Sequence, residues 1–188
     1  ILNKRVLRKD SEFRKVTILV TTRKERDEIN MRARREWARK NGKPLFWWFQ
    51  RPTRKMENTL EADHYAHSMS KFCPGVRSFY IPGVKCMLKA NTLPQACYAN
   101  GSQGRMIGLV HEDPNYVLPN GFPGEMIMIP PPRFIVMEVN HVGKEKKTSI
   151  LPCEHEATEI VYYQNGKKFV YRCWSNMVVL TFGLAVHE

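Results

Sequence analysis

A short polar run, Thr21, Thr22, Arg23 and Lys24, stands where a β-branched strand is expected to lead into a helix. The amino terminus of a helix presents unpaired amide donors and the positive end of the helix dipole, so it binds anions readily. The two cations beside those amides would add to the attraction. These four residues are therefore candidate contacts to nucleic-acid phosphates. The simpler interpretation is that Thr22 caps the helix, which we expect in either case.

A second polar group surrounds an expected tight turn at Asn100 and Gly101. Asn-Gly is the dipeptide that most favours hairpin turns, because both of its residues accept a positive φ. Turn geometry alone accounts for these two residues without any ligand. Side chains on or beside the turn could also donate hydrogen bonds to a single-stranded backbone, and they are Lys89, Asn91, Asn100, Ser102 and Arg105.

Other reactive residue types are present, but their spacing argues against catalysis. Asp63, His64 and His67 have helical spacing, yet a zinc site needs a third or fourth ligand that is missing here. No metal is expected. Cys153 and His155 are so close in an extended segment that they do not naturally face one another, so a thiol nucleophile with a histidine base is not expected.

Trp47 and Trp48 could stack on bases, as aromatic side chains do in single-strand binders. Alternation along a strand sends the two rings to opposite faces, so at most one of them stays near solvent. Packing in the core is the favoured role.

Positive charge is concentrated in the first part of the chain. The formal net charge is +12, and residues 1–58 hold 18 Lys and Arg against 7 Asp and Glu. The remaining residues hold 12 against 11. A local positive field favours a polyanionic partner, since each neutralised phosphate releases counterions. A solvated basic face without a partner is the alternative.

The five cysteines are odd in number and never spaced C-x-x-C, so neither a disulfide framework nor a ribbon-type zinc site is indicated. A reducing compartment, the nucleus or the cytoplasm, fits best. The longest apolar runs are too short to span a bilayer, and no secretory signal is visible. The 188 residues can bury one core plus a small satellite, so one domain with an insertion is expected. The chain begins with Ile1 and stops after an apolar run, which predicts a fragment of a larger protein.

The first fifty residues have the pattern of a strand, a helix and a second strand. Residues 16–20 form a short β-branched run, and Thr22 with Glu25 makes a capping box at a helix start. Leu45–Phe49 is a second apolar run typical of a buried strand. This order of elements favours a parallel sheet containing both strands.

The helix between these strands has one apolar stripe. Ile29, Ala33 and Trp37 recur at a spacing of four and predict its buried face. Gly42 and Pro44 predict its end. Three basic residues lie off the stripe, and they are Arg32, Arg35 and Arg39.

The second half of the chain consists of short apolar runs separated by three Asn-Gly pairs, 100–101, 120–121 and 165–166. This pattern predicts a small antiparallel β module. The triple proline at 130–132 donates no ladder hydrogen bonds, so a fresh strand is expected at 133–139.

Three segments, in this order, resemble the carboxy-terminal half of superfamily-one DNA helicases of the petite integration frequency and RecD-like families. The first is residues 18–30, ILVTTRKERDEIN, which is similar to the strand and helix that open the second RecA-like domain. The second is residues 82–91, PGVKCMLKAN, with 98–105, YANGSQGR, similar to the stretch that leads into an inserted SH3-like barrel. The third is residues 180–187, LTFGLAVH, similar to a strand that ends in Val-His in a nucleic-acid-contacting motif.

This resemblance implies an α/β fold: a RecA-like (P-loop NTPase-type) second helicase domain with an inserted SH3-like β barrel. Residues 1–80 and 174–188 would form the RecA-like part, and residues 81–173 the barrel. The run at 177–186 would then pair in the same sheet as residues 16–20. The resemblance also implies DNA contact by His187, although a lone terminal histidine is usually only solvated.

The implied parent enzyme uses ATP and magnesium to move along single-stranded DNA from five-prime to three-prime. Its partners would be single-stranded DNA and an amino-terminal RecA-like domain that binds the ATP. This chain has no G-x-x-x-x-G-K-[ST] phosphate loop, so alone it is expected to bind no cofactor and to be inactive. Position 188 departs from the family, with Glu in place of the usual Lys. The alternative is a non-enzymatic nucleic-acid-binding remnant of a mobile-element helicase, which an upstream phosphate loop would exclude.

Overall fold

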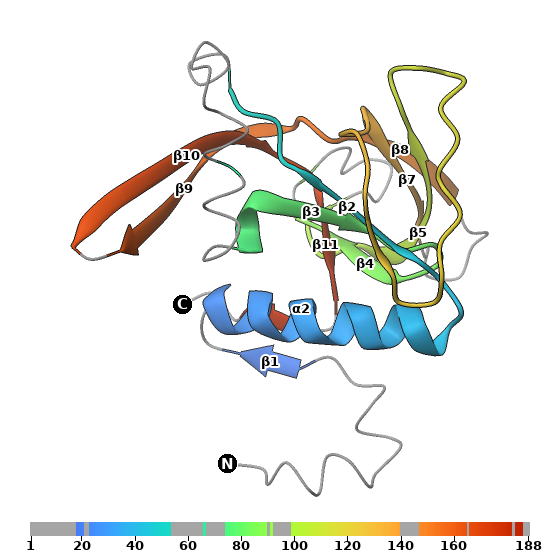
Figure 1. The fold of residues 1–188 in the computed structure, drawn as a ribbon, viewed down its shortest axis with the longest axis horizontal. Coiled ribbons are helices and arrows are strands. Elements are labelled where there is room, and N and C mark those ends of the chain that lie inside the picture. The colour runs from blue at the N-terminus through green and yellow to red at the C-terminus, as the bar shows by residue number, and fades with distance from the viewer. Residues whose placement is uncertain are drawn as a thin grey trace, which may run out of the picture.

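The computed structural model describes residues 18–20, 23–53, 66, 74–89, 91, 99–139, 147–164, 166–181 and 183–185. Within them the chain is mixed α/β and mostly sheet, with a long helix, α2 (Arg23–Lys40), and strands in four groups (Figure 1). No helix in these ranges is long and apolar enough to cross a membrane.

Strand β1 (Ile18–Val20) lies parallel to strand β12 (Gly183–Ala185), although almost the whole chain separates them. The expected pairing between the beginning and the end of the chain is confirmed for these residues. The earlier part of the 177–186 run differs, because β11 (Val178–Leu180) pairs antiparallel with β4 (Lys85–Leu88). The run is therefore divided between two sheets.

Helix α2 ends in a glycine cap, as predicted. Gly42 has a φ of 66°, a conformation that L side chains rarely adopt. The amide of Lys43 donates to the Ala38 carbonyl at 2.9 Å, and the amide of Gly42 donates to the Arg39 carbonyl at 3.4 Å. This is the hydrogen-bond pattern of a Schellman motif. Thr22, the predicted cap at the other end, lies outside the described residues.

The buried face of α2 is not the predicted stripe. Asn30, Arg34 and Ala38 are at most 6 % exposed, whereas the predicted line, one residue earlier in each turn, is only half-buried. Arg34 can lie inside because its guanidinium carbon sits 3.2 Å from the centroid of the Phe79 ring, while its stem packs as an apolar chain. Hydropathy patterning assigns an arginine to the surface, so the buried face predicted for the helix was wrong by one residue.

Strand β2 (Leu45–Phe49) is the central strand of a three-stranded sheet, between β3 (Arg77–Tyr80) and β6 (Met126–Met128). It is antiparallel to β3 and parallel to β6. The predicted buried strand is confirmed. The prediction that β2 shares a parallel sheet with residues 16–20 is wrong for the described residues, because β1 pairs with β12 instead. The chain thus passes through α2 from one sheet to another.

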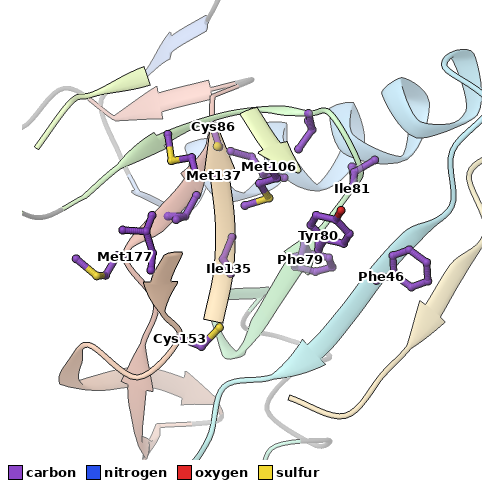
Figure 2. Close-up of a cluster of buried hydrophobic side chains, with 14 of the residues drawn as sticks. Phe46, Phe79, Tyr80, Ile81, Cys86, Met106, Ile135, Met137, Cys153 and Met177 are labelled. Carbon is purple, nitrogen blue, oxygen red and sulfur yellow. The ribbon is translucent and has the colours of Figure 1, made fainter. Parts of the chain in front are cut away.

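The second half of the chain is mainly antiparallel β, as predicted. Five strands are ordered β11-β4-β5-β7-β8, where β5 is Gln103–Val110, β7 is Phe134–Val139 and β8 is Lys147–Pro152. The fresh strand expected after the triple proline is therefore confirmed as β7. Figure 2 shows the core on one face of this sheet, which includes the buried side chains of Cys86, Met106, Ile135 and Met137.

The glycines of two of the three Asn-Gly pairs have the left-handed backbone that such turns need. Gly101 and Gly166 have φ values of 91° and 73°, and each lies beside a pair of antiparallel strands. The hairpin predicted at 120–121 is wrong, because this pair lies in the connection from β5 to β6, which belong to different sheets. The left-handed glycine there is Gly124, with a φ of 78°. A Cβ at Gly121 would instead collide with the Ile127 side chain, so that glycine serves close packing.

Strands β9 (Glu156–Gln164) and β10 (Lys167–Ser175) form a hairpin that extends away from the rest of the described chain in Figure 1. Midway along the hairpin the Tyr171 hydroxyl donates to the Gln50 carbonyl at 2.8 Å. The hairpin is therefore attached to the segment that follows β2.

Candidate nucleic-acid interface

The first predicted cluster lies at the junction of β1 and α2. Arg23 and Lys24 are the first two residues of α2, so they stand at the positive end of the helix dipole. The parallel register places Val20 opposite Ala185, so the carboxyl ends of β1 and β12 share one edge. Three of the predicted contacts lie outside the described residues, and they are Thr21, Thr22 and His187.

The second predicted cluster surrounds the turn at Asn100, and two of its polar side chains shape that turn. The Asn91 side-chain oxygen accepts a hydrogen bond from the Asn100 amide at 2.8 Å. The Ser102 hydroxyl oxygen accepts one from the Ala99 amide at 3.1 Å. The turn was expected to explain the presence of Asn100 and Gly101. The side chains of Asn91 and Ser102 also stabilise it through these hydrogen bonds.

Three exposed cations lie on or beside the β4–β5 pair: Lys85, Lys89 and Arg105. In the strand register Lys85 is opposite Arg105, and Arg105 is opposite Glu138 on the next strand. Like charges in directly opposite positions are unfavourable, while Glu138 offsets part of that charge. An anion bridging Lys85 and Arg105 would relieve their repulsion, so this pair is suited to a phosphate.

Lys85 is a residue that sequence reasoning missed. It begins β4, where it is exposed while Cys86 and Leu88 are buried. Period-two alternation is the signal that could have found it, because residues two apart share a face of a strand. Once β4 is recognised as a strand, Lys85 falls on its outward side, facing solvent.

Core packing is confirmed for both tryptophans. Trp48 is 2 % exposed, and the half-buried Trp47 packs against the main core. The Arg77 guanidinium carbon also covers the Trp47 ring, 4.8 Å from its centroid. Tyr163 on β9 and Phe122 before β6 are far more open, at 65 % and 79 % exposed. Neither ring was among the residues predicted from the sequence.

Cys153 is placed where a thiol stays protonated. It is 7 % exposed, and burial, the largest cause, raises the pKa of its thiol to about 12. The thiolate is the reactive form, so a nucleophilic role near neutral pH is disfavoured. His155, two residues later, is exposed. The residues weighed as metal ligands lie outside the described ranges, and they are Asp63, His64 and His67.

No protein-family model and no curated protein matches the chain. Solved structures that it resembles include Pif1 helicases. The Pif1 helicase of Candida albicans is 16 % identical with a TM-score of 0.46, over 90 % of this chain and 36 % of that one. Unliganded Pif1 from Bacteroides sp is 12 % identical with a TM-score of 0.41, over 90 % and 41 % of the two chains.

Bacteroides sp Pif1 in complex with ADP-AlF4 is 10 % identical with a TM-score of 0.42, over 94 % of this chain and 33 % of that one. This chain therefore spans only about a third to two fifths of the length of these helicases.

Proposed function

We propose that this chain is the second motor domain of a superfamily-one DNA helicase of the petite integration frequency and RecD-like families. Residues 1–80 and 174–188 form its RecA-like part, and residues 81–173 form an inserted SH3-like β barrel. An amino-terminal RecA-like domain supplies the site for ATP and magnesium. The two domains together couple ATP hydrolysis to five-prime to three-prime unwinding, and this one grips single-stranded DNA.

The observation that carries the proposal is the parallel pairing of β1 with β12. Parallel neighbours need a crossover connection, and here the crossover contains a whole antiparallel sheet. Such an arrangement is expected of an α/β domain interrupted by an insertion. The two parts are also hydrogen-bonded to each other, since β6 pairs with β2 and β11 pairs with β4.

DNA contact in this proposal uses two groups of residues. The first lies at the carboxyl edge of β1 and β12, the kind of edge where open α/β sheets bind ligands. It consists of Arg23 and Lys24, together with Thr21, Thr22 and His187, which lie outside the described residues and are assigned from the sequence. The second lies at the β4–β5 turn and consists of Lys89, Asn91, Asn100, Ser102 and Arg105, to which the register adds Lys85. Such donors and cations bind phosphates without reading sequence.

Binding to single-stranded DNA tests the proposal. We expect the 188-residue chain to bind an oligothymidine weakly, as measured by fluorescence anisotropy. If about four phosphates are engaged, log affinity falls by about 2.8 for each decade of salt. Oligonucleotides of other sequences should bind with similar affinity, since phosphate contacts carry no sequence information. A flat salt response contradicts phosphate contact.

The double variant Lys89→Gln, Arg105→Gln tests the second group of residues. Loss of two phosphate contacts should make the salt slope less steep by about 1.4. The matched control is Arg133→Gln, Lys147→Gln, which removes the same charge from exposed positions outside the proposed site. Equal losses in the two variants would mean that only the total charge matters.

The chain alone is expected to hydrolyse no ATP. Its sequence contains no phosphate loop to position the β- and γ-phosphates. Phosphate release with ATP, magnesium and oligothymidine should stay at the level of a protein-free blank. DNA-stimulated turnover that elutes with the chain in gel filtration would contradict the assignment to the second motor domain.

A further inference from the structure

Three arginines lie along one side of the carboxy-terminal half of α2. Arg32, Arg35 and Arg39 are all exposed and follow one another at intervals of three and four residues, which places them on one helix face. That face is turned away from the buried line through Arg34. Figure 1 shows β1 beside the amino-terminal half of α2, with no described strand below the other half. We name the surface formed by these three residues the arginine face.

The arginine face keeps a net positive charge. Glu36 is bonded to Lys40 at 2.5 Å, and Glu125 accepts a hydrogen bond from an amide of its own loop at 2.8 Å. Glu28 is exposed one turn before Arg32 and offsets one charge. Among the described residues, the three arginines have no ion-pair partner. Their guanidinium groups are therefore available to an anion.

Packing fixes the carboxy-terminal end of the arginine face. A Cβ on Gly124 would lie 2.9 Å from the Arg39 Cβ and 3.4 Å from the Arg35 carbonyl oxygen, so the loop before β6 packs directly on the helix. The Gly124 amide donates to the Lys43 carbonyl at 2.9 Å. Lys43, just beyond the helix, is exposed as well.

Stabilisation of the helix dipole accounts for only part of this row. Cations in the last turn complement the negative end of the dipole, which covers Arg39 and Lys40. Arg32 and Arg35 lie earlier in the helix and gain little from that effect. At a rise of about 1.5 Å per residue, Arg32 and Arg39 are about 10.5 Å apart along the axis, enough to reach several phosphates.

We propose that the arginine face binds the phosphate backbone of duplex DNA. Single-strand binders combine cations with aromatic rings on which bases stack. No residue of α2 between Arg32 and Arg39 carries an exposed ring; the exposed ring of Phe122 belongs to the loop that packs on the helix at Arg39. A duplex needs only cations set against a fixed row of phosphates. This surface is separate from both groups of residues in the proposed function and does not depend on it.

The triple variant Arg32→Gln, Arg35→Gln, Arg39→Gln tests this proposal in the full 188-residue chain. Binding to a mixed-sequence blunt duplex is measured by fluorescence anisotropy over a range of salt. Loss of three phosphate contacts should make the salt slope less steep by about 2.7. Glutamine is a good helix former, so the circular dichroism spectrum should not change. The control variant, Arg133→Gln, Lys147→Gln, Lys168→Gln, should keep the original slope.

Three results would overturn the proposal. The first is an equal loss of duplex binding in the control variant, and the second is an unchanged salt slope in the triple variant. The third is a wild-type chain that binds no duplex. Oligothymidine binding, measured in parallel, separates this proposal from the proposed function. We expect the triple variant to lose duplex binding and keep most single-strand binding. Duplex binding without any single-strand binding would contradict the proposed function and leave the arginine face standing.

Discussion

Replacing Gly104 with alanine is expected to lower the free energy of unfolding by about 3 kcal/mol. Gly104 lies in β5, where a Cβ would collide with the Glu138 carbonyl oxygen and lie 2.7 Å from the Met137 Cε. The oxygen belongs to the backbone of β7, so it moves aside only if the β5–β7 pairing is disturbed. Thermal unfolding followed by circular dichroism should show a Tm lower by about 6 to 12 °C for a chain of this size.

Gly108→Ala is the matched control in the same strand. Its Cβ would lie 3.6 Å from the nearest Val136 atoms, an ordinary contact, so no loss of stability is expected. Gly101→Ala should fall between the two, because it has open space but a φ of 91°, which costs about 1 to 3 kcal/mol. Equal Tm values for the Gly104 and Gly108 variants would contradict the close approach of β7 to β5.

Features set by a few neighbouring residues could be predicted from the sequence. The helix end at Gly42 and the turns at Gly101 and Gly166 follow from the freedom of glycine at positive φ. Leu45–Phe49 follows from its apolar run. The pairing of β1 with β12 is different, because no local pattern connects strands so far apart. It was expected only through the family resemblance.

Features set by tertiary packing could not be predicted. Arg34 is buried because Phe79 offers a ring to its guanidinium, and that contact joins the helix to a strand over forty residues away. Asn120-Gly121 has the composition of a hairpin turn, yet β5 and β6 go to different sheets, so no hairpin exists there to close. Composition describes which turns a segment can make, whereas strand pairing decides which ones form.

At the candidate interface, too, the sequence indicated which residue types are present but not what each side chain contacts. The sequence identified Asn91 and Ser102 as polar side chains near a turn, but their oxygens accept hydrogen bonds from that turn. Lys85 was not predicted, because the reason to propose it is its register opposite Arg105, which only the strand pairing reveals. The arginines of α2 were recognised only as residues off the apolar stripe. Their common face became evident when the buried side of the helix was known.

Cys86 and Cys153 are expected to react with iodoacetamide about a thousandfold more slowly in the folded chain than in the unfolded chain at about pH 8. Burial raises the pKa of each thiol from 9.0 to about 12. The ionised fraction at that pH then falls from about a tenth to about one in ten thousand. Mass spectrometry of the peptides that contain each cysteine measures the rates, with urea-unfolded chain as the reference. Lys147→Cys provides an exposed thiol as the control and should react at the ordinary rate.

The same raised pKa values predict a loss of stability in alkali. Because the folded pKa of these thiols lies above the unfolded value, their contribution is fully present below about pH 9 and is lost as the pH rises toward about 12. Tyr80, whose pKa burial raises to about 12, acts in the same direction above about pH 10. Urea unfolding at increasing pH should therefore show a falling free energy of unfolding in this window. Rapid alkylation of Cys153 in the folded chain would contradict its burial and would reopen the possibility of thiol chemistry beside His155.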